Sequence, residues 1–303
     1  MRTLFIFSLL GGAAFGQPEG VSGPTSGYIF DGEARELRPI RGFVGAAHLG
    51  AALVGDADAA SASSDGMMAA ASRFGAIEVV RGFDSAVPVR VELAQAAGAV
   101  LFAWSGHDLA AVFTATRKVS VWRGVDRMAT GTAPFDISAI DGDITGVLFD
   151  GERLALAVNG AVYLAKDGET RRILQVDEPS AMIRTGGDLF VADRGRGQVL
   201  RVRDYAGLAT VETVADVAMP VGLQMTRRGL MVASAGARSV DLFDVATGTR
   251  IASEALDFVP TRMEALGSRP LALLNRGSVD EPLYVLDSSD TPRVYFVPAG
   301  RNR

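Results

Sequence analysis

The sequence contains no cysteine and only two histidines, His48 and His107, among its 303 residues. The absence of cysteine excludes disulfides, thiolate nucleophiles, cysteine-ligated zinc or iron–sulfur clusters, and a lipid anchor on cysteine. Lysine is almost absent as well, because Lys118 and Lys166 are the only lysines among 30 basic residues. The bases of this protein are therefore nearly all arginines, and polar loops collect several arginines from this composition alone.

An excess of positive charge is also lacking, since 30 basic and 35 acidic residues give a formal net charge of −5. A protein that binds nucleic acid or an anionic membrane needs a basic surface to neutralise phosphates. We therefore expect neither as a partner. A hydrophobic content of 48% in a chain of this length is typical of a globular protein that buries a large core.

The first residues have the pattern of a signal peptide. Arg2 supplies a charge, Leu4 to Leu10 form an apolar run, and Ala14 and Gly16 are the small residues of a cleavage site. The run is too short to cross a bilayer of about 30 Å as a helix. We expect residues 1–16 to be removed on export to the periplasm or the medium, with no membrane insertion afterwards. Residues 17–27 are expected to form a flexible segment before a single folded domain at 28–303.

An internal repeat with a period of about forty residues fills most of the remaining chain. Three consecutive copies run from Pro179 to Asp216, from Pro220 to Leu256 and from Pro260 to Pro298. Each copy has four short runs rich in β-forming residues, separated by Gly, Asp, Asn, Ser or Pro, which is the pattern of successive hairpins. The period is that of one β-propeller blade.

Weaker copies precede these three. Two of them run from Ile144 to Val176 and from Ala99 to Ala139, and another opens near Gly45 with AAHLGAAL and passes through a loop from Gly55 to Asp65. Before them, the hairpin GYIFDGEARELRPI matches the third and fourth strands of a unit. We therefore predict an all-β propeller of seven blades with an incomplete first blade. Six blades result if the half unit packs outside a neighbour, and a two-sheet sandwich or an open solenoid are the alternative folds.

Two segments carry a family resemblance. LFVADRGRGQVLRV at 189–202 and LMVASAGARSVDLFDVATGTRI at 230–251 resemble the repeats of NHL and YVTN-type β-propellers. The opening GYIFDGEARELRPIRGFVGAAHLG also resembles that of uncharacterised exported propeller proteins of soil bacteria. The resemblance implies a propeller fold and an extracytoplasmic location. Its motifs describe strands and turns, so it implies no activity.

Motifs that carry a catalytic mechanism are missing from the sequence: it has no G-x-S-x-G elbow, no Walker A motif and no H-E-x-x-H. His48 is expected to be a packing residue and His107 a turn residue. Asn159 and Asp193 end second strands, where their oxygens could face a channel mouth and bind a ligand or a hard cation, although both types commonly form turns. We expect no catalytic residue, no metal and no cofactor.

One regularity points to a binding surface. The loops between second and third strands should all emerge on one face of a propeller, because each blade repeats the same path. These loops hold Arg73, Arg117, Arg194, Arg196, Arg238 and Arg276. Guanidinium groups on one face could bind carboxylate, sulfate or phosphate. The sequence therefore favours a monomeric, non-enzymatic binding module for a protein or glycan, and a lactonase-like hydrolase is the alternative.

Overall fold

The structure is a computed structural model that describes residues 23–83, 87–95, 98–267, 270–275, 277–289 and 292–300. The expected signal peptide at 1–16 and residues 17–22 of the expected flexible segment lie outside the described residues. The first strand begins at Thr25, so the end of that segment belongs to the first sheet. The described residues contain no helix that is long and apolar enough to cross a membrane.

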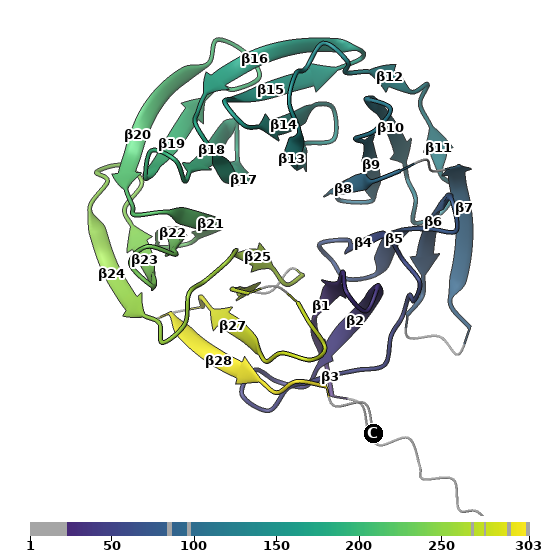
Figure 1. The fold of residues 1–303 in the computed structure, drawn as a ribbon, viewed down its shortest axis with the longest axis horizontal. Helices are drawn as coiled ribbons and strands as arrows, with labels where there is room; N and C mark the ends of the chain where they lie inside the picture. Colours follow the sequence, from purple (N-terminus) through teal and green to yellow (C-terminus); the bar gives the residue numbers. More distant parts are fainter. Residues whose placement is uncertain are drawn as a thin grey trace, which may run out of the picture.

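Seven antiparallel sheets form a closed ring of blades (Figure 1), which confirms the predicted seven-bladed propeller. In blades 2 to 7 the strands follow each other in sequence order from the centre outwards. Blade 2 contains β4 (Ala59–Ala62), β5 (Met68–Arg73), β6 (Ala76–Arg81) and β7 (Val89–Gln95). Blade 3 contains β8 (Val100–Ser105), β9 (Asp108–Phe113), β10 (Lys118–Arg123), and the short outer strands β11 (Thr130–Gly131) and β12 (Phe135–Asp136).

The remaining blades keep four strands each, at the positions that the repeat predicts. Blade 4 contains β13 (Ile144–Phe149), β14 (Leu154–Val158), β15 (Ala161–Lys166) and β16 (Glu169–Gln175). Blade 5 contains β17 (Pro179–Thr185), β18 (Asp188–Asp193), β19 (Gln198–Arg203) and β20 (Thr210–Asp216). Blade 6 contains β21 (Pro220–Thr226), β22 (Gly229–Ser234), β23 (Ser239–Phe243) and β24 (Arg250–Ala255). Blade 7 contains β25 (Glu264–Ala265), β26 (Leu271–Leu273), β27 (Leu283–Asp287) and β28 (Arg293–Val297).

Blade 1 contains three strands, β1 (Thr25–Asp31), β2 (Glu36–Arg41) and β3 (His48–Leu49), and it corrects two predictions. The segment AAHLGAAL does not open blade 2, because β3 within it pairs with β2 in blade 1. The first strand of blade 2 is β4, inside the stretch from Gly55 to Asp65 that was expected to be a loop. Alanine and serine have a weak preference for strands, so the sequence of β4 does not predict one. The four residues form a strand because they pair with β5.

The direction of β1 corrects a third prediction. Gly27, near its start, packs so closely on Leu266, directly after β25, that a Cβ there would lie 2.5 Å from the Leu266 Cβ. Asp31, at its end, accepts a hydrogen bond from the N–H of Val279, in the loop between β26 and β27, at 2.7 Å. Strand β1 thus runs opposite to β25, as a second strand does. The opening hairpin therefore forms the second and third strands of blade 1 rather than the third and fourth, and the described residues supply no innermost strand to this blade.

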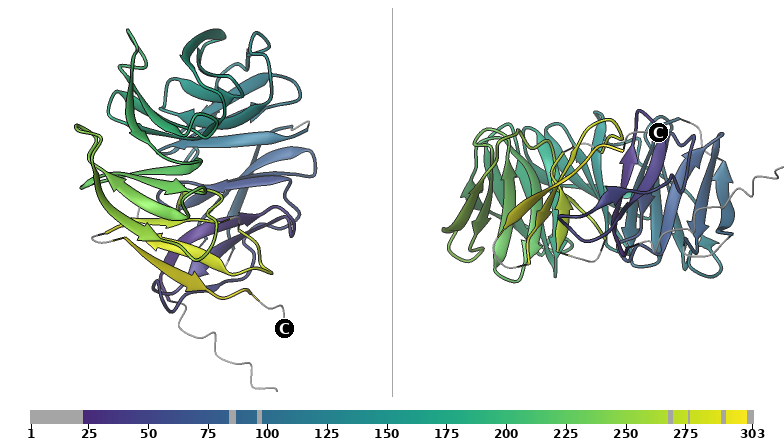
Figure 2. Two further views of the ribbon diagram at one scale, coloured as in Figure 1. Left: turned by 60° about the vertical axis from the view of Figure 1, so that its left-hand side comes forward. Right: turned by 90° about the horizontal axis from the view of Figure 1, so that it is seen from below.

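Hydrophobic packing between blades closes the ring. Seven clusters of buried residues each join two adjacent blades. In one of them Ile29 and Ile40 of blade 1 pack with Leu271 and Leu283 of blade 7, which joins the first blade to the last. Second strands such as β14 are buried along their whole length, because neighbouring blades cover both of their faces. Figure 2 shows the ring edge-on, with strands crossing its thickness, so the loops at their ends form two opposite faces.

Candidate functional site

We call upper face the side that carries the turns between second and third strands and the connections that enter each blade; the lower face is the opposite side. Six of the predicted loop residues lie in upper-face turns or at their edges: Arg73, Arg117, Asn159, Arg194, Arg196 and Arg238. Asp193 ends β18 at the same face. Arg276 lies outside the described residues. The repeated path of the blades thus brings loop arginines from four different blades to one side of the ring.

Backbone geometry explains two of these positions. Arg117 and Arg238 adopt left-handed conformations with φ of 54° and 51°, at the last turn position before the third strand. Glycine occupies the matching position in blade 5, where Gly197 has φ of 66°. Left-handed backbone is unfavourable for residues with a Cβ. Arg117 and Arg238 adopt it because the turn requires it, so the turn geometry fixes the position of both residues independently of any ligand.

Asp193 organises the turn that carries Arg194 and Arg196. Its side chain is fully buried, and its two carboxylate oxygens accept hydrogen bonds from the N–H groups of Asp177 at 3.0 Å, Glu178 at 3.1 Å and Arg196 at 3.3 Å. These contacts tie the turn to the connection that enters blade 5. The carboxylate is therefore a structural acceptor within the loop and does not open toward solvent.

The arginines of this turn are paired with carboxylates from the same connection. Arg194 forms an ion pair with Glu178, and Arg196 forms one with Asp177 at 2.9 Å. The hydrogen bond that each arginine donates to its partner carboxylate raises the pKa of the arginine. The Arg194 and Arg196 side chains are still 41% and 43% exposed, so both charges of each pair face solvent.

The other predicted arginines differ in their surroundings. Arg73 lies 3.5 Å from Glu78 and stacks over the Phe74 ring at 4.6 Å. Arg117 donates to the backbone carbonyl of Gly142. Arg238 forms no side-chain ion pair with any residue that the structure describes.

Another upper-face pair was missed by the sequence reasoning. Arg35, in the turn between β1 and β2, binds Asp58 at 2.7 Å. With the pairs at Arg73, Arg194 and Arg196, this gives the upper face alternating positive and negative groups rather than a uniformly positive mouth. The sequence signal for the missing partners of Arg194 and Arg196 was the acidic segment VDE at 176–178, directly before the inner strand of blade 5.

The two histidines lie apart from the upper-face turns. His48 is exposed in β3, so it is not the packing residue that the sequence suggested. His107 lies in the lower-face turn between β8 and β9, with its Nε2 3.3 Å from Asp65 Oδ2 and its Nδ1 3.3 Å from Asp126 Oδ2. Burial raises the pKa of Asp65, but hydrogen bonds from Ser63, the Met67 N–H and His107 outweigh it, so the pKa of that carboxyl is lowered.

The centre of the ring has few chemical groups of the kind that metal-dependent hydrolases use. Among the inner strands β4, β8, β13, β17, β21 and β25, the only carboxylate is that of Glu264. The described part of the chain holds no group of three or more His, Cys, Asp or Glu residues placed to bind a metal ion.

Comparison with solved structures supports the fold. A functionally unknown protein from Desulfotomaculum acetoxidans DSM 771 superposes with a TM-score of 0.65 at 11% identity, over 91% of this chain and 99% of the other. Citrobacter koseri AztD gives 0.58 at 12% identity, over 90% and 94%. Kluyveromyces lactis Hsv2 gives 0.53 at 12% identity, over 75% and 73%. All three are β-propellers, and at these identities the likeness shows the fold alone.

No protein-family model and no curated protein matches the sequence. The class of the protein is therefore defined by its architecture, a seven-bladed β-propeller. Its function has to be argued from the surface that the loops build, because one fold hosts many functions.

Proposed function

We propose that this chain is an exported, monomeric, non-enzymatic binding module of the NHL and YVTN type, which uses its upper face to bind a protein or an acidic glycan. The observation that carries the proposal is the set of exposed charge pairs that loops of different blades present on that face. Loops held by a rigid scaffold are where binding residues concentrate. Export rests on the signal-peptide pattern at residues 1–16.

The paired charges define how a partner would bind. Arg194 and Arg196 each keep more than a third of their side chain exposed beside Glu178 and Asp177. An exposed ion pair contributes only about 0–1 kcal/mol to stability, so a guanidinium can exchange its carboxylate for one on a partner at little cost. The unpaired Arg238 needs no exchange. A partner that presents carboxylates in a row would use several blades at once.

The experiment measures binding of the mature protein to polygalacturonate and to a carboxylate-rich protein at rising salt. We expect affinity to fall as salt passes physiological strength, where the screening length is about 8 Å. The double variant Arg194→Ala, Arg196→Ala should bind more weakly with an almost unchanged melting temperature. Arg172→Ala, which removes an exposed arginine on the outer strand β16, is the control and should bind like the parent.

Absence of any salt-sensitive binding, or equal loss in the double variant and the control, would refute the proposal. Nothing specific favours the lactonase-like alternative, since the inner strands of the described part offer a single carboxylate. The polygalacturonate and protein arms of the titration separate the two kinds of partner.

A further inference from the structure

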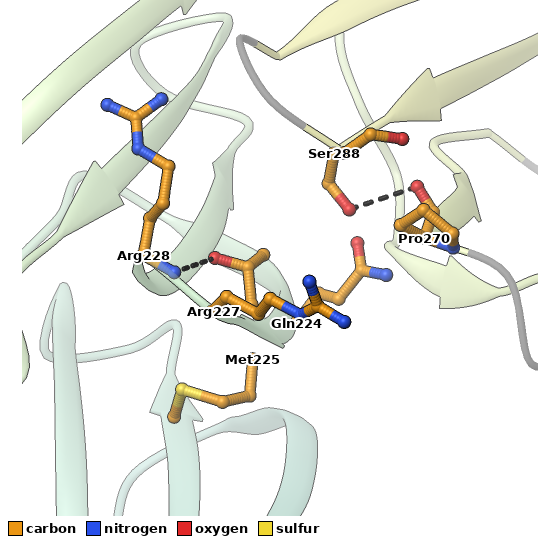
Figure 3. Close-up of a pocket in the computed structure, with 8 residues that line it drawn as sticks. Gln224, Met225, Arg227, Arg228, Pro270 and Ser288 are labelled. Carbon is orange, nitrogen blue, oxygen red and sulfur yellow. Dashed lines mark hydrogen bonds between the residues drawn. The ribbon is translucent and has the colours of Figure 1, made fainter.

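A cavity opens on the lower face between blades 6 and 7 (Figure 3). Its volume is about 650 Å³, and it is lined by Gln224, Met225, Thr226, Arg227, Arg228, Pro270, Ser288 and Ser289. The first five residues belong to the inner strand β21 and the turn that follows it, and the others flank β26 and β27. Pockets for small ligands usually measure about 300–1,000 Å³, so the cavity has room for an organic molecule rather than only an inorganic ion.

Two polar groups in this cavity have no partner among the residues that the structure describes. Arg227 lines the same cavity as Gln224 (Figure 3), and its guanidinium forms no hydrogen bond or ion pair with any described residue. The Gln224 Oε1 atom is buried and accepts no hydrogen bond in the described part of the chain. A buried acceptor without a donor is destabilising and uncommon in native proteins, so it requires a physical explanation.

The rest of the lining complements these two groups. The Ser288 hydroxyl donates to the carbonyl of Pro270 at 3.0 Å, which leaves its lone pairs available as acceptors. The Thr226 hydroxyl donates to the carbonyl of Gly229 at 2.9 Å and accepts from the N–H of Arg228 at 3.2 Å, so one lone pair of this hydroxyl is left. Met225 and Pro270 add apolar surface. No acidic residue is among the described residues that line the cavity, so the Arg227 charge is not neutralised there.

We propose that this cavity binds a small carboxylate that carries a hydroxyl or amide N–H donor on one of the two carbons nearest the carboxylate. The carboxylate binds the planar fork of Arg227, which suits it in a bidentate geometry. The adjacent donor satisfies Gln224 Oε1, and further hydroxyls of the ligand reach Ser288 and Thr226. Acidic sugars and N-acylated amino acids share this chemistry.

The test is isothermal titration of the mature protein with D-glucuronate, with N-acetylglycine and with D-glucose as the neutral probe. We expect saturable binding of at least one of the two carboxylates and none of D-glucose. Arg227→Gln should weaken that binding at least tenfold, because it removes a charge-assisted pair. Gln224→Leu, which removes the acceptor and keeps the volume, should weaken it severalfold. Arg172→Gln is the matched control and should leave it unchanged.

The two carboxylates distinguish the sources of the ligand: preference for D-glucuronate indicates a sugar, and preference for N-acetylglycine indicates an acylated amino acid. Failure of both carboxylates to bind, equal binding of D-glucose, or unchanged binding in Arg227→Gln would overturn the proposal. Melting curves of each variant exclude unfolding as the cause of a loss. Because the cavity and the upper face lie on opposite sides of the ring, either proposal can fail without the other.

Discussion

Replacement of Asp193 by alanine tests whether a buried carboxylate shapes the upper-face loop. The change leaves the N–H groups of Asp177, Glu178 and Arg196 without their acceptor. Hydrogen bonds to a charged group contribute about 1.5–3 kcal/mol each. Counting the two shorter bonds at the lower value gives a loss of about 3 kcal/mol in the free energy of unfolding. In a chain of this size that corresponds to a fall of roughly 6 °C in the melting temperature.

The assay is thermal and denaturant unfolding of the parent and three variants. Asp193→Asn keeps one acceptor oxygen and should lose about half as much stability as Asp193→Ala. Asp216→Ala, in the same blade, removes an exposed carboxylate whose one hydrogen bond comes from Gln198 at 3.2 Å, and it should lose less than about 0.5 kcal/mol. Equal stabilities for Asp193→Ala and Asp216→Ala would refute the reasoning.

The same variant separates structure from binding on the upper face. Asp193→Ala should lower both stability and affinity, because the turn that carries Arg194 and Arg196 loses its fixed shape. The double variant Arg194→Ala, Arg196→Ala should lower affinity alone, since exposed charges contribute little to folding. If Asp193→Ala retained full affinity despite its lower stability, the shape of this turn would have no part in binding.

Two further predictions concern contacts between blades 4 and 5. Arg171 donates to the carbonyls of Gly207, Tyr205 and Ala206 at 3.0, 3.2 and 3.4 Å. Arg171→Ala should therefore lower the free energy of unfolding, measured with urea, by about 1–2 kcal/mol. The neighbouring variant Arg172→Ala is the control and should lower it hardly at all. The Tyr205 hydroxyl donates to Asp150 Oδ2 at 2.6 Å. Burial raises the pKa of Asp150, but hydrogen bonds from Tyr205 and from the Arg153 and Glu152 N–H groups outweigh it and lower the pKa. Tyr205→Phe should therefore be about 1 kcal/mol less stable than the parent above pH 5. The difference should shrink as the pH falls below about 4 and Asp150 becomes protonated in the folded state. A stability difference that is constant with pH would contradict this prediction.

Most of the ring could be predicted from the sequence because each blade repeats a strong local signal. The second strand LALAV at 154–158 is apolar at every position and is bounded by turn residues, as a strand covered on both sides must be. Blades 4 to 7 follow the predicted units for this reason. In blade 3, the unit predicted from Ala99 to Ala139, the fourth strand is replaced by two short strands, β11 and β12, which both pair with β10.

The strand positions in blade 1 were predicted wrongly, although the sequence of its first turn indicates the correct ones. The turn from Asp31 to Arg35 matches the turn from Asp193 to Gly197, with a buried aspartate at its start and left-handed backbone at its end, at φ of 58° and 66°. Alignment of these two turns would have assigned the hairpin to the second and third strands. The partner of Asp31 could not be predicted in this way, because Val279 is 248 residues away in the sequence.

The site was predictable only in part. The common face of the loop arginines follows from the repeat, whereas their carboxylate partners depend on how close the connection into each blade passes. Arg196 and Asp177 are 19 residues apart and meet because Asp193 binds both the turn and the connection. The unpaired groups in the cavity between blades 6 and 7 carried no recognisable motif, since a glutamine and an arginine near a strand end are ordinary surface residues.

The arginine-rich composition acquires a structural explanation at the blade junctions. Arg81 of blade 2 donates to the carbonyls of Asp126 and Arg127 in blade 3 at 2.9 and 2.6 Å. Arg123 of blade 3 donates to the carbonyl of Gly151 in blade 4. Arg171 of blade 4 donates to three carbonyls in blade 5. A guanidinium has five N–H donors in a rigid fork and can bind several carbonyls at once, which the point charge of lysine does less well. Arginines with such partners hold the ring together and carry no information about ligands. Within the cavity Arg227, and in the upper-face turns Arg238, have no carboxylate or carbonyl partner among the described residues, so their charges are available for binding without the loss of an existing pair.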